Sequence, residues 1–97
     1  MIYEVHATEK FSKWLKKLKD AIAKASITRR IERLEEGNFG DCKSVGESLF
    51  ELRINVGKGY RVYFTNINKQ ILLLLIGGDK STQEKDIKTA KKMMEEL

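Results

Sequence analysis

The sequence lacks proline altogether, which by itself excludes nothing, and contains only one cysteine and one histidine. Since a single thiol, Cys42, cannot form a disulfide within the chain, the composition favours a reducing compartment, the cytoplasm. One cysteine and one histidine do not make a metal site, and we expect neither a metal nor another cofactor. The longest apolar run, residues 71–76, is far shorter than the roughly 20 residues of a membrane-spanning helix. The N-terminus carries Glu4 and no long apolar segment, so we expect no secretory signal.

The 97 residues are enough for one domain, residues 1–97, with a single core. Hydrophobic residues make up 41% and charged residues 34%, which is typical of a folded soluble protein and not of a disordered one. Lysine and arginine outnumber aspartate and glutamate by 19 to 14, a formal net charge of +5. Such a charge attracts nucleic acid, an acidic membrane or an acidic protein. The charge alone is equally consistent with simple solubility.

The first part of the chain predicts a strand followed by two helices. Residues 2–7 alternate and are rich in strand formers. After a candidate cap at Thr8, apolar side chains recur at helical spacing. These are Phe11, Trp14, Leu15 and Leu18. A second helix is expected over residues 20–36, with Gly37 just past its end.

After a polar loop at residues 38–46, three strand-like segments follow. Their short connections favour antiparallel pairing. These segments are residues 48–56, 59–66 and 71–77. The last of them, ILLLLI, is apolar throughout, which favours a place inside the sheet.

The end of the chain predicts a third helix. Gly77 and Gly78 are expected to let the chain turn tightly after the last strand. Ser81 and Glu84 match the S-x-x-E capping box and predict a helix from there to the C-terminus. The expected fold class is α+β, in the order β-α-α-β-β-β-α. It combines a small antiparallel β-sheet with an N-terminal helical hairpin and a C-terminal helix.

The stretch ELRINVGKGYRVYF predicts a hairpin with one arginine in each strand. Side chains alternate between the two faces of a strand. Because the apolar residues of both strands must face the core, Arg53, Arg61 and Tyr63 fall together on the outer face, with Glu51 beside them. With the turn at residues 57–59, Arg53 is expected opposite or diagonal to Arg61.

Two positive charges at this distance repel each other, and the pattern allows two explanations. In the first, Glu51 pairs with either arginine and the group is structural. In the second, the two guanidiniums form a phosphate site, because their planar forks match phosphate oxygens. Lys80, just before a helix N-terminus, and Lys58, in the turn, would add positive charge to that site.

The same segments carry a family resemblance. An E-L-R strand is followed by a G-x-G-Y-R-x-Y hairpin, an L-L-x-G-G-x-K turn and a D-I-x-x-A helix, and the N-terminal helix reads T-x-x-F-x-x-W-L. In this order, over nearly the whole chain, the motifs resemble the RelE/ParE toxin superfamily. More narrowly, they resemble its HigB-like (Gp49-like) addiction module killer branch.

The resemblance implies a bacterial type II toxin that a cognate antitoxin neutralises, with the oligomeric state set by the antitoxin. RelE- and HigB-like members cut mRNA on the ribosome, whereas ParE-like members inhibit DNA gyrase without cutting RNA. By position, the basic residues that match the phosphate-binding residues of the cutting members are Arg53, Arg61 and Lys80. In the implied reaction the RNA 2′-hydroxyl attacks the adjacent phosphate, and no metal is required.

The resemblance also has a gap. Several cutting members carry a tyrosine or histidine near the C-terminus as acid or base, and this chain ends KKMMEEL. Proton transfer would then fall to Tyr63, Lys80, Lys58 or, if its pKa is raised, Glu51, or catalysis depends on the ribosome. The candidate catalytic residues are Arg53, Arg61, Lys80 and Tyr63, and the candidate substrate-binding residues are Lys58 and Glu51.

Three functions therefore stay open: a ribosome-dependent mRNA endoribonuclease, a ParE-like gyrase inhibitor, and an RNA-binding module without catalysis. Other conspicuous residues have structural interpretations. We expect His6 to be a partly exposed structural residue, Cys42 a free surface thiol and Trp14 a core residue. The lysines and arginines of the helices are expected on a solvated face, with contact to ribosomal RNA as the functional hypothesis.

Overall fold

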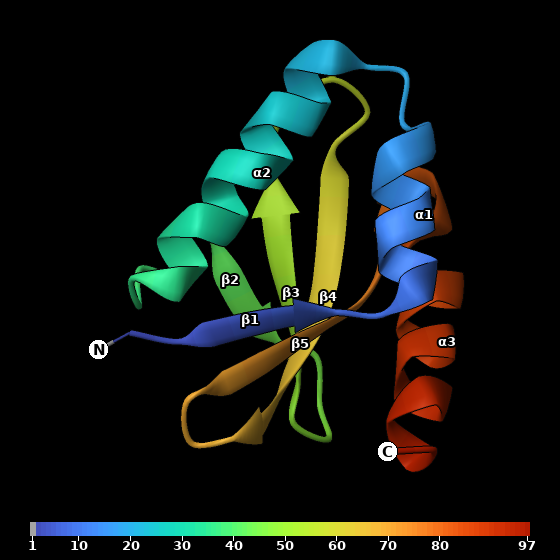
Figure 1. The fold of residues 1–97 in the computed structure, drawn as a ribbon. Coiled ribbons are helices and arrows are strands. Elements are labelled where there is room, and N and C mark those ends of the chain that lie inside the picture. The colour runs from blue at the N-terminus through green and yellow to red at the C-terminus, as the bar shows by residue number, and fades with distance from the viewer. Residues whose placement is uncertain (1) are drawn as a thin grey trace.

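The alternating and helical stretches of the sequence fold into a five-stranded sheet with helices on both faces (Figure 1). The computed structural model describes residues 2–97. The strands are β1 (Glu4–Ala7), β2 (Cys42–Ser44), β3 (Leu49–Ile54), β4 (Tyr60–Asn68) and β5 (Ile71–Asp79). The helices are α1 (Glu9–Lys17), α2 (Ala21–Glu35) and α3 (Gln83–Glu95), with a 3-10 turn at Lys80–Thr82. The predicted α+β class and element order are confirmed, with β2 as an additional strand.

The sheet is mixed rather than purely antiparallel, with the order β1-β5-β4-β3-β2. β1 runs parallel to β5, and the other neighbours are antiparallel. The expectation of an antiparallel sheet is therefore wrong for β1. Short connections dictate antiparallel pairing only between consecutive strands, whereas β1 and β5 are separated by most of the chain. The loop predicted at residues 38–46 is also partly wrong, because its polar residues Cys42–Ser44 pair with β3.

The apolar strand β5 lies between β1 and β4, as predicted from its sequence. The register shifts between Tyr63, which pairs with Ile76, and Phe64, which pairs with Leu74. Leu75 is thus an extra residue, a β-bulge. Leu74 joins the core under α2, while Leu75 and Ile76 join a second core under α3. The uninterrupted apolar run of β5 therefore contributes side chains to the cores on both faces of the sheet.

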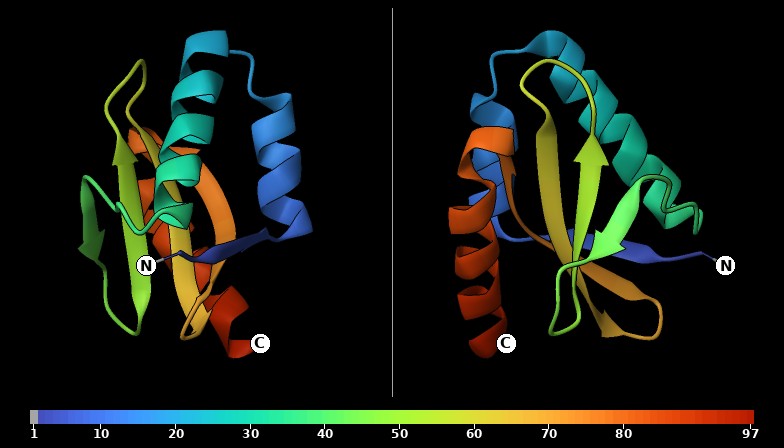
Figure 2. Two further views of the ribbon diagram at one scale, coloured as in Figure 1. Left: turned by 60° about the vertical axis from the view of Figure 1, so that its left-hand side comes forward. Right: turned by 180° about the vertical axis from the view of Figure 1, so that it is seen from behind.

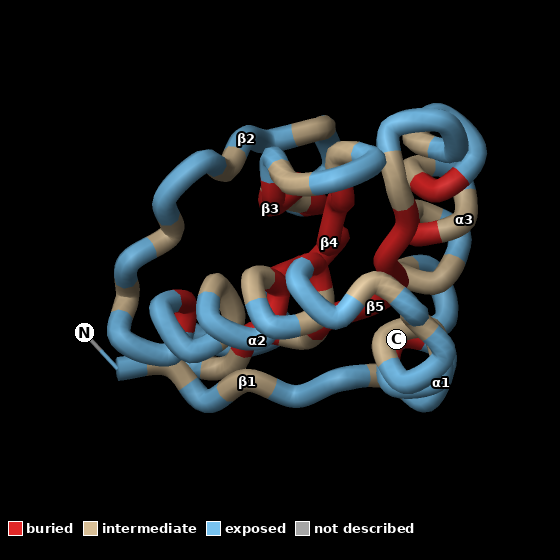
Figure 3. Tube along the Cα trace, turned by 90° about the horizontal axis from the view of Figure 1, so that it is seen from above, coloured by how far each residue is buried: buried red, intermediate tan, exposed pale blue. Residues whose placement is uncertain are grey.

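Helices α1 and α2 cover one face of the sheet and α3 covers the other (Figure 2), and each face has its own core. The larger core lies under α1 and α2 and contains Phe11, Ile27, Leu34, Leu52, Val62 and Phe64. The smaller core lies under α3 and contains Leu49, Tyr63, Leu75, Ile76 and Ala90. Figure 3 shows the buried residues concentrated in β3, β4 and β5 between the helices. No helix of residues 2–97 is long and apolar enough to cross a membrane.

The helix starts follow local capping chemistry, with one correction. Thr8 accepts a hydrogen bond from the Phe11 N–H and caps α1, as predicted. The predicted capping box at Ser81 is wrong. The Asp79 carboxylate accepts from the Ser81 N–H at 2.8 Å and caps the 3-10 turn, and α3 begins only at Gln83. The turn places Lys80 on the surface at the end of β5.

Gly77 and Gly78 were expected in a turn, but both lie inside β5. Each leaves room for one helix side chain on opposite faces of the sheet. The Trp14 ring of α1 lies over Gly77, and the Asp86 carboxylate of α3 lies over Gly78. The two glycines are therefore needed for the close approach of helices rather than for a turn.

Candidate functional site

The candidate site begins with two arginines on neighbouring strands. Arg53 of β3 and Arg61 of β4 are direct partners in the antiparallel register, and Glu51 is paired with Tyr63 two residues along. The parity argument that placed these four side chains on one face is confirmed. The turn before Arg61 is closed by a hydrogen bond from the Gly59 N–H to the Val56 carbonyl oxygen.

This face is not the open outer face that the sequence predicted. Glu51 and Tyr63 are fully buried, and Arg61 is only 7% exposed. Arg53 keeps 33% of its side chain exposed. The reason is α3, which packs across this face and closes the second core over it. Alternation identified the residues that share the face but not the helix that covers it.

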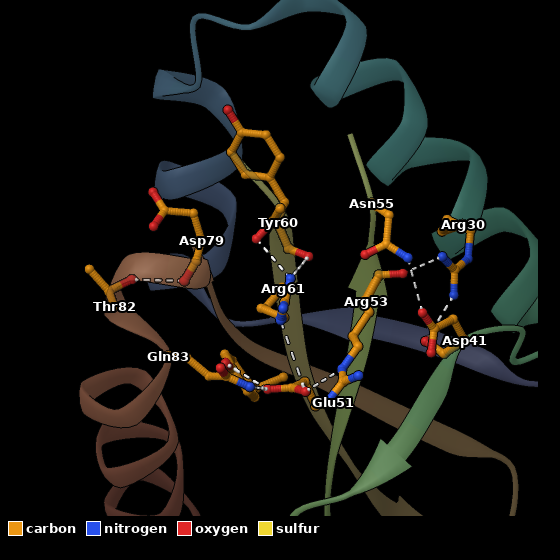
Figure 4. A network of polar contacts seen from close by, with 12 residues as sticks. Arg30, Asp41, Glu51, Arg53, Asn55, Tyr60, Arg61, Asp79, Thr82 and Gln83 are labelled. Carbon is orange, nitrogen blue, oxygen red and sulfur yellow. Dashed lines mark hydrogen bonds and ion pairs between the residues drawn. The ribbon is translucent and has the colours of Figure 1, made fainter. Parts of the chain in front are cut away.

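Glu51 lies at the centre of a polar network (Figure 4). Its Oε1 atom accepts from Arg53 Nε at 3.0 Å and lies 4.0 Å from Arg61 Nε. Its Oε2 atom accepts from Gln83 Nε2 at 2.7 Å and from the Tyr63 hydroxyl at 3.1 Å. Burial alone would raise the pKa of Glu51, but these hydrogen bonds from Gln83, Arg53 and Tyr63 outweigh it and lower the pKa.

These contacts correct two expectations for proton transfer. Glu51 was a candidate base only with a raised pKa, and its pKa is lowered. Burial, together with the nearby Glu51 carboxylate, raises the pKa of Tyr63 far above its usual range. With no exposed surface on either side chain, direct contact between a substrate and Glu51 or Tyr63 is excluded in this arrangement.

Arg61 is a buried cation with an incomplete set of partners. Its Nη1 atom donates to the carbonyl oxygens of Gly59, at 2.8 Å, and Tyr60, at 3.3 Å. Its Nε atom is buried and has no hydrogen-bond partner within residues 2–97. A buried donor without a partner is costly, and the nearest compensating charge is the Glu51 carboxylate, whose Oε1 atom lies 4.0 Å away.

Two lysines lie next to Arg61 at the end of the sheet. A shallow groove is lined by Lys58, Asp79, Lys80 and Ser81. A Cβ atom on Gly59 would lie 3.4 Å from Arg61 Nη1 and 3.6 Å from the Lys80 Cβ. Gly59 therefore lies between the side chains of Arg61 and Lys80. The hydrogen bond from Ser81, together with the charge of Lys58, lowers the pKa of Asp79. The structure thus brings Arg53, Arg61, Lys80 and Lys58 to one end of β3, β4 and β5.

The sequence did not single out two further residues of this region. Gln83, the first residue of α3, is the only hydrogen-bond link from that helix to Glu51 within residues 2–97. Arg30 of α2, interpreted above as part of a solvated face, instead donates to three carbonyl oxygens, those of Arg53, Phe39 and Asp41 (Figure 4). No local pattern marks either role, because both depend on where a distant helix lies.

The remaining candidates have ordinary surroundings. His6 is exposed and contacts Glu4. Cys42 is half-buried on β2, and burial raises the pKa of its thiol. Trp14 packs against Phe11 and Tyr60, which confirms its assignment to the core. Among residues 2–97 no group of three or more His, Cys, Asp or Glu side chains could hold a metal ion.

Comparison with known proteins identifies relatives of both sequence and fold. A protein of Haemophilus influenzae named "Uncharacterized protein" is 56% identical over 97 residues, which are 100% of this chain and 98% of that protein. A mutant of the E. coli toxin RelE in the free state superposes with a TM-score of 0.68 at 20% identity, covering 87% of this chain and 90% of that one.

The archaeal RelE–RelB complex from Pyrococcus horikoshii matches with a TM-score of 0.61 at 21% identity, over 82% of this chain and 97% of that one. The fold is therefore that of the RelE toxins. A family model described as "Phage derived protein Gp49-like (DUF891)" matches residues 13–96. On this match, which includes every helix and strand except β1 and the start of α1, the chain belongs to the Gp49-like family of phage-derived proteins.

Proposed function

We propose that the chain is the toxin of a type II toxin–antitoxin system and cleaves mRNA on the ribosome. The observation that carries the proposal is the directly opposed pair Arg53 and Arg61, with Lys80 beside Arg61. The fold is shared with the free RelE mutant of E. coli and with RelE in the archaeal RelE–RelB complex, and this supports the assignment to this class of toxin.

The arginine pair suits the chemistry of RNA cleavage by the neighbouring hydroxyl. The 2′-oxygen attacks phosphorus, the bond from phosphorus to the 5′-oxygen breaks, and the products are a 2′,3′-cyclic phosphate and a free 5′-hydroxyl. Negative charge gathers on the phosphate oxygens in the transition state, and fixed cations stabilise it. Arg53 offers terminal nitrogens that make no hydrogen bond within residues 2–97, and Arg61 adds a second positive charge directly opposite it.

Proton transfer is assigned by exposure. Lys80 is exposed at the edge of the groove and can deliver a proton to the leaving 5′-oxygen. Lys58, exposed in the neighbouring turn, is assigned to holding the RNA backbone. Since Tyr63 and Glu51 are enclosed and His6 is in β1, residues 2–97 place no histidine or exposed tyrosine at this groove. Removal of the 2′-proton is therefore assigned to the ribosome, which would make cleavage ribosome-dependent.

The same charge implies two macromolecular partners. A chain with a formal charge of +5 and a cationic groove attracts the RNA of the ribosome through many phosphate contacts. An acidic antitoxin segment is the partner expected to block the groove, because complementary charge speeds and orients association. RelE is complexed with RelB in the archaeal and E. coli structures, which supports a protein antitoxin for this chain as well.

One observation favours a second function, inhibition of DNA gyrase without RNA cleavage. The Glu51 carboxylate faces both arginines and neutralises part of their charge, as a purely structural ion pair would. In that case Arg53 and Arg61 hold β3 against β4, and another surface of the chain contacts gyrase. Toxicity would then be accompanied by DNA damage and intact mRNA.

The deciding experiment is induction of the protein in bacteria followed by mapping of mRNA 5′ ends. New 5′-hydroxyl ends inside coding frames are expected for the natural chain and not for Arg61→Ala. Lys69→Ala is the matched control, since it removes one positive charge from the β4–β5 turn at the other end of the strands. Growth arrest with intact transcripts would rule out the nuclease and lead to a gyrase supercoiling assay.

A further inference from the structure

Glu51 is a buried carboxylate for which phosphate chemistry has no direct use. Its side chain has no exposed surface, although it lies beside the two arginines proposed to hold the phosphate. It cannot reach a ribose hydroxyl from this position. A buried charge is nevertheless costly to maintain, so its presence calls for a role within the protein.

The four contacts of Glu51 divide between its two oxygens. Oε1 faces the arginines, with Arg53 Nε at 3.0 Å and Arg61 Nε at 4.0 Å. Oε2 faces the other way and accepts from Tyr63 at 3.1 Å and Gln83 at 2.7 Å. The second pair of contacts orients the carboxylate, because two donors on one oxygen allow little rotation. The first pair then sets the orientation of the guanidiniums.

The direction of the arginine contacts matters. Both guanidiniums turn their Nε atoms toward the carboxylate, and the terminal nitrogens of Arg53 make no hydrogen bond within residues 2–97. A guanidinium fork recognises phosphate oxygens only in a defined plane. Without the carboxylate, two cations on directly paired residues would repel each other and separate.

We propose that Glu51 is a positioning residue, which fixes the Arg53 and Arg61 guanidiniums toward a single phosphate group and is itself fixed by Tyr63 and by Gln83 at the start of α3. The proposal rests on the proposed function for its catalytic consequence. The orientation of the arginines, by contrast, is a property of the protein alone. Through Gln83, the position of α3 is coupled to the geometry of the cation pair.

The first test is spectroscopic and needs no substrate. In the natural chain the Arg53 Nε–Hε signal should appear in a nitrogen–proton NMR spectrum with slow solvent exchange, since this group is hydrogen-bonded to Glu51. In Glu51→Gln the rate of solvent exchange of this proton should rise at least tenfold. In Gln83→Met the rate should rise by a smaller factor. Glu84→Gln is the matched control. Like Glu51→Gln it removes one negative charge, but from an exposed residue of α3 that directly follows Gln83. Unchanged exchange in folded Glu51→Gln would overturn the proposal.

The second test is kinetic, on ribosomes programmed with a defined mRNA. Misplacing a catalytic group by about 1 Å can cost on the order of 100-fold in rate. For Gln83→Met we expect kcat to fall 10- to 100-fold while KM changes less than about threefold, with Glu84→Gln equal to the natural chain. A folded Gln83→Met with natural kcat, or with a loss confined to KM, would contradict positioning.

Two further results keep the test decisive. If Glu51→Gln does not fold, Gln83→Met still decides, because it leaves the charge of Glu51 in place and removes only one of its orienting donors. Glu51→Asp keeps the negative charge on a shorter side chain, and its kcat should stay below that of the natural chain. Full activity in Glu51→Asp would mean that charge alone suffices. Absence of cleavage by the natural chain would refute the nuclease proposal, while the NMR result would still decide the inference about Glu51.

Discussion

The Asp86 carboxylate of α3 lies directly over Gly78 of β5, in the space where any other residue would carry its Cβ atom. A Cβ at Gly78 would be 1.9 Å from Asp86 Oδ2 and 2.9 Å from Thr82 Oγ1. The same Asp86 oxygen accepts a hydrogen bond from the Thr82 hydroxyl at 2.6 Å. Since Gly78 is the β5 partner of Arg61, this contact sets how closely α3 approaches the cationic site.

Gly78→Ala should therefore destabilise the protein by about 1–3 kcal/mol, the usual cost of an added methyl group in a closely packed region. The measurement is urea unfolding followed by circular dichroism. Asp86→Ala in the same chain should recover part of the loss, because it removes the nearest clashing atoms. Additive effects of the two substitutions would contradict a direct clash.

The lowered pKa of Glu51 predicts a loss of stability in acid. In the folded chain this carboxylate binds its proton less readily than at the ordinary pKa of 4.5, so the unfolded state takes up more protons in acid. Its contribution to the free energy of unfolding is complete above pH 4.5 and is lost as the pH falls through the folded pKa. Glu51→Gln should lower stability at pH 7 by about 3 kcal/mol, the scale of a broken buried ion pair, and by less in acid.

The measurement for Glu51 is the free energy of unfolding between pH 3 and pH 7 for the natural chain and Glu51→Gln. Asp79, whose pKa is also lowered, makes the same pH-dependent contribution to the free energy of unfolding of both proteins. This contribution cancels when the two free energies are subtracted. A difference that stays constant with pH would show that Glu51 does not titrate as its contacts require.

The β2–β3 turn carries two residues that are poorly suited to it. Glu47 and Ser48 have φ angles of 56° and 65°, and the Leu49 N–H donates to the Gly46 carbonyl oxygen at 3.0 Å, which together describe a type I′ turn. Asn-Gly is the preferred pair in such a turn. Glu47→Asn with Ser48→Gly should therefore stabilise the protein by about 1 kcal/mol and raise Tm by roughly 4–8 °C. An unchanged or lowered Tm in thermal unfolding would refute this prediction.

Arg61→Lys should not preserve activity, although it preserves charge. A lysine lacks the planar fork, and burial favours its neutral form. It would also lose at least one of the bonds to Gly59 and Tyr60 that hold Arg61 in place. We expect kcat for mRNA cleavage to fall about 100-fold or more. Arg53, whose side chain is 33% exposed, should tolerate Arg53→Lys better. The opposite ranking of the two variants would mean that Arg53 carries most of the phosphate contact.

Local patterns predicted much of this structure. The caps at Thr8 and Gly37, the interior place of β5 and the shared face of Arg53 and Arg61 all follow from spacing along a few residues. Hydrophobic periodicity and strand alternation decide such features within one or two turns or strands. The cationic pair could be found in this way before any family resemblance was considered.

Long-range packing decided the rest. Whether a strand face is open or covered depends on which helix lies over it, and α3 reaches this face from the other end of the chain. The packing of α3 buries Glu51 and Tyr63, which the sequence predicted on an exposed face. The parallel pairing of β1 with β5 likewise joins segments separated by most of the chain. The sequence by itself determined the elements and the side chains that share a face. Only the tertiary structure decided which of these side chains are buried. Burial depends on contacts between segments that are far apart in the sequence, and no repeating pattern of residues marks which distant segments will meet.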